Sequence, residues 1–256
     1  MKPFPPVVKN LLIINIAVFI LARFFLKDLV YYLSVYFIKS DFFKPYQIIT
    51  HMFLHYDFTH LFFNMFALFM FGQVLEYYTG SKRFFILYFV SGLGAIFIHE
   101  LVIWIQHYSI LHDSKIFFAN PIFSNFEIMV NNNKKFFGSN ALLLLNEWKN
   151  NQSNEMFMQL AIEETEKVMN FLNRTTFSIP TMGASGAVFG LLAAFATLFP
   201  NADLYFLFIP VPMKAKYIIP FYAILELFFG VANFKGDNIA HFAHLGGAIF
   251  GFILAL

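Results

Sequence analysis

The sequence predicts an all-α membrane protein built from six transmembrane helices. Of its 256 residues, 59% are hydrophobic and only 12% are charged, whereas a soluble domain is nearer half apolar and a quarter charged. Apolar runs of about 20 residues recur along the chain, which is the length that a helix needs to cross a bilayer. Polar residues inside such runs are costly, so they are the first candidates for function.

Six apolar runs are the predicted spanning helices, and together they form one domain over residues 1–256. The runs cover residues 8–26, 58–79, 84–105, 182–199, 217–234 and 239–256. The fourth and sixth runs are short but within the range of a spanning helix. The first run lacks the small-residue cleavage site of a signal peptide, so we expect it to be retained as a helix.

Two segments lie outside the apolar runs. Residues 27–57 are rich in aromatic side chains, which suits a loop at the membrane interface. Residues 106–180 are polar and are predicted to form an extramembrane insertion within the domain. Inside this insertion, residues 154–173 place apolar side chains near one face of a helix, with Ser153 as its candidate N-cap. Three interpretations of the insertion remain open: a cap over the site, a substrate-selecting surface and a tolerated addition without a role.

Lysine and arginine residues in the short loops set the expected orientation, because such residues are enriched on the cytoplasmic side. The residues on that side are Lys2, Lys9, Lys82, Arg83, Lys214 and Lys216, against Lys27, Lys39, Lys44 and Lys235 on the other. We therefore expect both termini in the cytoplasm and residues 106–180 outside it. A short six-helix chain without a transit-like N-terminus fits a bacterial inner membrane.

Composition also excludes several kinds of site. A net charge of +2 without a basic stripe argues against a nucleic-acid partner. The chain has no cysteine, which excludes disulfides, thiol catalysis and thiolate metal sites. We expect no cofactor, and the expected partners are the lipid bilayer and other membrane proteins.

The polar residues of three runs are expected to meet near one face of the membrane. His60 and Asn64 are spaced i, i+4 and share a helix face in the second run. Ser185 is the fourth residue of the fourth run, and His244 is the sixth residue of the sixth run, which also contains His241. All three runs are expected to enter from the same side, so these groups lie at similar depth.

This set of residues fits acyl transfer by a serine nucleophile. The Ser185 hydroxyl needs an adjacent base, and His244 is the candidate. The developing oxyanion needs donors, which the Ser185 backbone N–H and the His60 and Asn64 side chains can supply. No intramembrane aspartate is placed as a third member, so the predicted unit is a Ser–His dyad. We expect His241 to pack structurally.

Glycines flank both members of the predicted pair. Gly183, Gly186 and Gly190 surround the serine, and Gly247 and Gly251 follow the histidine. Small residues four apart let helix backbones approach closely. Close approach of the fourth and sixth helices is what a Ser–His hydrogen bond requires.

Several motifs occur along the chain in a fixed order. They are THMFLH at 50–55, HLFFNM at 60–65, Gly72-xxx-Glu76, Gly80-Ser81, GASGAVFG at 183–190 and AHLGG at 243–247 with Gly251. Together they resemble the rhomboid family of intramembrane serine proteases over most of the chain outside residues 106–180. The resemblance implies a rhomboid-like bundle whose substrates are single-span membrane proteins, cut in or near the transmembrane segment.

The resemblance also implies residue roles. Ser185 matches the family nucleophile and His244 its base, while His60 and Asn64 match the positions that line the oxyanion hole with the Ser185 backbone N–H. Phe189 matches an aromatic position that packs against the catalytic histidine. The supporting residues are Gly183, Gly186, Phe189, Gly247, Gly251 and His55, the last of which we expect to fix the first loop.

Three alternatives remain open at this point. The first is a metal site, which is suggested by His55, His60, His241 and His244. We do not expect it, because no carboxylate or fourth ligand is evident at that depth. A catalytically silent relative that binds membrane proteins is the second alternative. Loss of either member of the predicted pair would favour it, and both are present. A transporter or channel is the third, and it predicts polar residues throughout the membrane depth.

Overall fold

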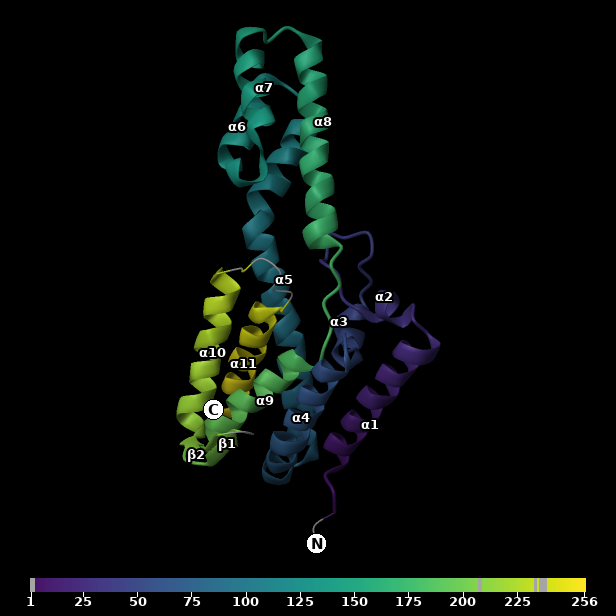
Figure 1. Cartoon of the computed structure of the whole chain (residues 1–256), viewed down its shortest axis with the longest axis vertical. Coiled ribbons are helices and arrows are strands. Elements are labelled where there is room, and N and C mark those ends of the chain that lie inside the picture. The colour runs from purple at the N-terminus through teal and green to yellow at the C-terminus, as the bar shows by residue number, and fades with distance from the viewer. Residues whose placement is uncertain (1–2, 207–208, 233, 235–238) are drawn as a thin grey trace. The chain divides into compact units, whose positions relative to one another are not determined.

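Figure 1 shows the computed structural model, in which residues 3–206, 209–232, 234 and 239–256 are described. Residue 233 of the predicted 217–234 helix, and Lys2 and Lys235, lie outside the described residues. The chain divides into two compact units. Unit 1 comprises Met1–Tyr36, Phe42–Leu101 and Pro180–Leu256, and unit 2 comprises Phe37–Asp41 and Val102–Ile179.

Unit 1 is mostly helical. Its elements are α1 (Pro6–Ile20), the π-helical turn η1 (Leu21–Phe25), α2 (Leu29–Leu33), α3 (Gln47–Thr50), the 3-10 turn η2 (His51–Phe53), α4 (Phe58–Thr79), the first part of α5 (Ser81–Ala119), α9 (Ser185–Leu198), β1 (Asp203–Phe206), β2 (Ile209–Lys214), α10 (Ala215–Ala232) and α11 (His241–Ala255). The two short strands pair antiparallel, and the sequence did not predict them. Asp203 and Lys214 close this hairpin with a 2.8 Å ion pair.

The apolar runs appear as helices of two lengths. Four described helices are long and apolar enough to cross a membrane, namely Pro6–Phe25, Phe58–Thr79, Ser81–Ala119 and Ala215–Ala232. Helices α9 and α11 are apolar but have only 14 and 15 residues, which is about 21 to 23 Å at 1.5 Å per residue. The predicted all-α membrane bundle is confirmed, with four helices of spanning length and two shorter ones among the described residues.

Helix α4 lies beside α1, and α11 lies between α9 and α10 in contact with both (Figure 1). The buried side chains of α1, α4, α5 and α9 form one apolar core. Its fully buried members include Leu68 and Leu75 of α4, and Phe84 and Tyr88 of α5. This core sets the positions of the helix ends at which the polar residues lie.

Glu76 links the two helices α1 and α4. Its carboxylate accepts hydrogen bonds from the backbone N–H groups of Val7 and Val8, at 3.0 and 2.8 Å, and from the Ser81 hydroxyl at 2.6 Å. The first N–H groups of a helix have no partner within the helix, and the positive end of its dipole favours an anion. Glu76, near the end of α4, therefore caps the start of α1.

Replacing Glu76 by alanine is expected to destabilise unit 1. The change removes a 97% buried carboxylate with three hydrogen bonds and leaves two N–H groups unpaired, at a cost of about 3 kcal/mol. The thermal unfolding midpoint in detergent should fall by several degrees. Glu163→Ala, the same change at an exposed position of the chain, is the control, and equal midpoints for the two variants would contradict the capping role.

Unit 2 has its own core. Besides the last part of α5, it contains α6 (Phe123–Asn132), the 3-10 turn η3 (Lys134–Phe136), α7 (Ser139–Asn150), α8 (Glu155–Leu172) and the π-helical turn η4 (Asn173–Phe177). Phe117, Phe126 and Trp148 are almost fully buried at its centre. Asn154, rather than the predicted Ser153, caps α8, because its side chain accepts a hydrogen bond from the N–H of Met156.

Helix α5 continues to Ala119, 14 residues beyond the end predicted at residue 105. The continuation has a clear pattern, because Ile103, Ile110 and Phe117 recur every seven residues and pack in the core of unit 2. Its polar residues are also satisfied: Asp113 accepts hydrogen bonds at 3.0 Å from the side chains of Asn132 and Asn133. The first polar residues of the predicted insertion therefore belong to an amphipathic continuation of the helix.

Candidate active site

Ser185 and His244 are in direct contact. Ser185 is the first residue of α9, and His244 lies in the first turn of α11. The Ser185 Oγ and the His244 Nε2 are 2.8 Å apart, which is the distance of a hydrogen bond. The hydroxyl can donate to an unprotonated ring nitrogen, and this is the arrangement that activates a serine nucleophile.

The His244 ring is held in place by an aromatic neighbour. The Phe189 ring stacks on it with a centroid distance of 4.3 Å and an interplanar angle of 7°. Phe189 is one helical turn after Ser185 on α9, so one helix presents both the hydroxyl and the stacking surface. The structure thus shows the packing that the family resemblance implied for Phe189.

Glycines permit the approach of α9 and α11. A Cβ atom at Gly247 would collide with the backbone of Gly186, and one at Gly251 would collide with the backbone of Gly190. The two helices therefore touch backbone to backbone at two levels, as small residues four apart allow. This contact begins one turn after His244 and brings its ring within reach of Ser185.

Gly183 shapes the turn that leads into α9. Its φ angle is 131°, a backbone conformation that favours glycine. Its N–H donates to the His51 carbonyl at 2.9 Å. A Cβ at this position would lie 2.8 Å from the Nε2 and Cε1 atoms of His60 and 3.5 Å from the Ser185 Oγ. The absence of a side chain thus leaves His60 close to the serine.

His60 and Asn64 lie on the same face of α4, as predicted. Asp57 caps the helix by accepting from the His60 N–H at 2.7 Å, and the Tyr56 N–H lies 3.4 Å from the His60 Nδ1. The Asn64 Nδ2 donates to the His60 carbonyl at 2.8 Å. An amide nitrogen carries two hydrogens, so Asn64 retains a second donor.

The loop before α4 contains two buried neutral histidines. The His51 Nδ1 lies 2.9 Å from the Gln47 carbonyl, and the His55 ring makes an edge contact with the His60 ring at 5.1 Å. Burial lowers the pKa of His51 to about 4. Burial, with a smaller contribution from His60, lowers the pKa of His55 to about 3.

The lowered pKa values of these two histidines predict that the folded chain loses stability in mild acid. An unfolded histidine binds a proton near pH 6.5, whereas His51 and His55 bind theirs only near pH 4 and pH 3 in the folded chain. Since the unfolded state binds more protons between these values, the free energy of unfolding falls as the pH falls from about 6.5 towards 4. Thermal midpoints measured in detergent from pH 7.5 to pH 4.5 test this, and His55→Asn should flatten the slope; a wild-type midpoint independent of pH would contradict it.

Glu226 is the residue of the site that sequence reasoning missed. It lies on α10, and its Oε2 is 2.6 Å from the His241 Nδ1 and 3.0 Å from the His244 Nδ1. The expectation that no carboxylate lies at the depth of these histidines was wrong, and His241 does more than pack. A signal was present, because Glu226 is a lone carboxylate in an apolar run, and such residues mark function by default.

Glu226, His241 and His244 are residue types that can bind a metal ion. Among the described residues, their potential ligand atoms all lie within 4.8 Å of one another. Ligand atoms around a tetrahedral zinc ion at about 2.0–2.1 Å lie about 3.3 Å apart. The 2.6 and 3.0 Å separations from Glu226 are instead those of charge-assisted hydrogen bonds and ion pairs. The geometry therefore favours direct carboxylate–histidine contacts.

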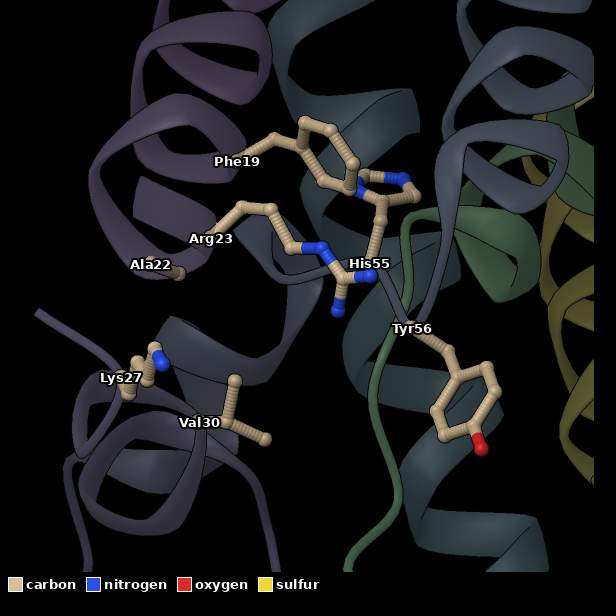
Figure 2. Close-up of a pocket in the computed structure, with 7 residues that line it drawn as sticks. All are labelled: Phe19, Ala22, Arg23, Lys27, Val30, His55 and Tyr56. Carbon is tan, nitrogen blue, oxygen red and sulfur yellow. The ribbon is translucent and has the colours of Figure 1, made fainter. Parts of the chain in front are cut away.

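A cavity of about 480 Å³ lies next to His55 (Figure 2). Figure 2 shows that the side chains of Phe19, near the end of α1, and Arg23, in η1, point toward the His55 side chain. The lining residues are Phe19, Ala22, Arg23, Lys27, Val30, His55 and Tyr56. Neither Ser185 nor His244 lines it, so this cavity is separate from the Ser185–His244 contact.

A family model described as the Rhomboid domain matches residues 43–112 and 153–256, which is more than half of the chain. The chain therefore belongs to the rhomboid family, as its motifs suggested. The match excludes residues 113–152, which fall inside the predicted insertion. Membership supports a function of the intramembrane-protease type.

Two curated relatives match part of the chain. An uncharacterised mitochondrial rhomboid protein of Schizosaccharomyces pombe is 40% identical over 76 residues, which are 29% of this chain and 19% of that protein. The mitochondrial Rhomboid protein 1 of Saccharomyces cerevisiae is 36% identical over 72 residues, which are 28% of this chain and 20% of that protein. The matched region thus spans about a fifth of the length of these relatives.

Proposed function

We propose that this chain is an intramembrane serine endopeptidase that cleaves transmembrane segments of membrane proteins with Ser185 and His244. The observation that carries the proposal is the 2.8 Å contact between the Ser185 Oγ and the His244 Nε2. A serine in a membrane helix ordinarily bonds a carbonyl of its own helix. Here the hydroxyl begins its helix and faces a histidine of another, in a chain of the rhomboid family.

The short length of α9 supports a position for Ser185 below the membrane surface. Helix α9 is about 21 Å long, against about 30 Å for the hydrocarbon core of a bilayer. The exposed Asp203–Lys214 ion pair of the hairpin that follows it suits one membrane face. The opposite end of α9, where Ser185 lies, would then sit below the other face. A substrate backbone within the membrane can reach it there, and water can reach it from that face.

The proposed reaction has two steps. The Ser185 Oγ attacks the scissile carbonyl carbon while the His244 Nε2 takes the hydroxyl proton. The resulting oxyanion accepts hydrogen bonds from the Ser185 backbone N–H, and from His60 and Asn64 of α4. His244 then gives the proton to the leaving amine. Water, activated in the same way, hydrolyses the acyl-enzyme and restores the Ser185 hydroxyl.

The proposed partners are transmembrane protein substrates and the lipid bilayer, without nucleic acid and without a cofactor. The integral membrane location follows from the apolar helices and the family. The two relatives named above are mitochondrial proteins, so they lend no support to the bacterial inner membrane expected from the sequence. Cell fractionation followed by immunoblotting of the native chain distinguishes these membranes.

A serine-directed fluorophosphonate tests whether Ser185 is activated. Mass spectrometry of the labelled, detergent-purified chain should find the adduct on Ser185, and both Ser185→Ala and His244→Ala should lose it. Ser91→Ala is the matched control, because Ser91 is a fully buried serine of α5 whose hydroxyl has no hydrogen-bond partner among the described residues. Folded protein that carries no adduct on Ser185 would favour a catalytically silent relative instead.

A further inference from the structure

Glu226 lies where a carboxylate is costly. It is the single acidic residue of the apolar helix α10, and its side chain is only 14% exposed. An ionised group in such a place is retained only where partners satisfy it. The positions of these partners therefore indicate what the carboxylate does.

Both partners are histidines in the first turn of α11. The His241 Nδ1 lies 2.6 Å from the Glu226 Oε2, and the His241 ring also stacks on Phe229 of α10. Gly230 brings the two helices close, because a Cβ there would lie 3.2 Å from the His241 Cβ. Packing of α10 against α11 thus holds Glu226 next to the histidines, and the same oxygen lies 3.0 Å from the His244 Nδ1.

The two nitrogens of His244 face different groups. The Nε2 faces the Ser185 Oγ and must be unprotonated to accept its proton, so the ring hydrogen belongs on Nδ1. That nitrogen faces the Glu226 Oε2, at 3.0 Å but without the alignment of a hydrogen bond. Catalytic hydrogen bonds often align only when substrate is bound. A carboxylate at this place favours the productive tautomer and stabilises the imidazolium that forms on proton transfer.

We propose that Glu226 is a positioning residue for His244, so that the reacting unit is a Ser185–His244–Glu226 triad on three helices in place of the predicted dyad. This inference rests on the proposed function. During attack the Ser185 proton moves to the His244 Nε2, the Nδ1 hydrogen stays on the ring, and Glu226 remains an anion throughout. His241 donates to the same carboxylate and holds it at the required place.

The test compares Glu226→Gln, Glu226→Asp and wild-type chains in proteoliposomes that contain a metal chelator, with a single-span model substrate. Glu226→Gln keeps the size of the side chain and removes its charge, and it should lower kcat by about 10²- to 10⁴-fold with little change in KM. Glu226→Asp keeps the charge on a shorter side chain, and its kcat should be at least about tenfold higher than that of Glu226→Gln. Glu163→Gln, the same change at an exposed position, should match the wild type.

The outcomes separate this proposal from the function on which it rests. No cleavage by the wild-type chain, either with or without the chelator, would contradict the proposed function itself. Cleavage by Glu226→Gln with a wild-type kcat would overturn only the role of Glu226. A Glu226→Asp variant that is folded, by its thermal midpoint, but no faster than Glu226→Gln would also overturn it. Loss of wild-type activity on adding the chelator would assign Glu226 and the histidines to a metal instead.

Discussion

Replacing Ser185 by alanine is expected to lower the rate of substrate cleavage by about 10⁴-fold or more, to the limit of detection. The change removes the only atom of the chain proposed to form a bond with substrate, and alanine fills the start of α9 without a clash. His244→Ala should cost about as much, because a serine without its base is a weak nucleophile. Initial rates on a quenched transmembrane substrate in proteoliposomes measure both effects.

The double variant makes this prediction sharper. The Ser185 Oγ and the His244 Nε2 are 2.8 Å apart and act as one unit in the proposed reaction. The Ser185→Ala/His244→Ala chain should therefore be no slower than either single variant. Losses that add up on a logarithmic scale would mean that the two residues act independently and would contradict the proposed pair.

Replacing Gly247 by alanine is expected to have the second largest effect. Its new Cβ would collide with the backbone of Gly186, so α9 and α11 must move apart. Overpacking of this kind costs about 1–3 kcal/mol of stability, and a displacement of about 1 Å at reacting groups costs about 10²-fold in rate. We expect a lower thermal midpoint together with about a 10²-fold lower cleavage rate.

Gly138→Ala is the matched control for this prediction. A Cβ at Gly138 would meet no atom within 4 Å, and its φ angle of −82° is open to any residue. This variant should keep both the midpoint and the rate of the wild type. A Gly247→Ala chain that behaves in the same way would show that backbone contact between α9 and α11 does not set the Ser185–His244 distance.

Much of the fold follows from the apolar runs. The second predicted run, 58–79, coincides with α4, and the other runs begin or end within a few residues of their helices. The end of the third run is the exception, because membrane hydropathy is a poor guide where a helix leaves the apolar run. Ile110 and Phe117 continue the helical period beyond residue 105, and their burial within unit 2 overrides the polar composition around them.

The meeting of Ser185 and His244 was foreseeable because few polar residues interrupt the apolar runs, and the glycines beside them indicated where helices touch. Glu226 was not foreseen because the third member of the site was sought as an aspartate and among helices with the same direction. Helix α10 runs the opposite way, so a residue in its second half reaches the level at which α11 begins. The spacing of residues along the chain does not show this, whereas the contacts of Glu226 with His241 and His244 do.

Cleavage of a single-span substrate in proteoliposomes, with the cut position mapped by mass spectrometry, shows directly whether Ser185 acts as the nucleophile of an intramembrane protease. The wild-type chain should produce two fragments from one cut in or near the transmembrane segment. The Ser185→Ala chain, reconstituted to the same density, should leave the substrate intact. Fragments of the same mass from Ser185→Ala would contradict the assignment of Ser185 as the nucleophile.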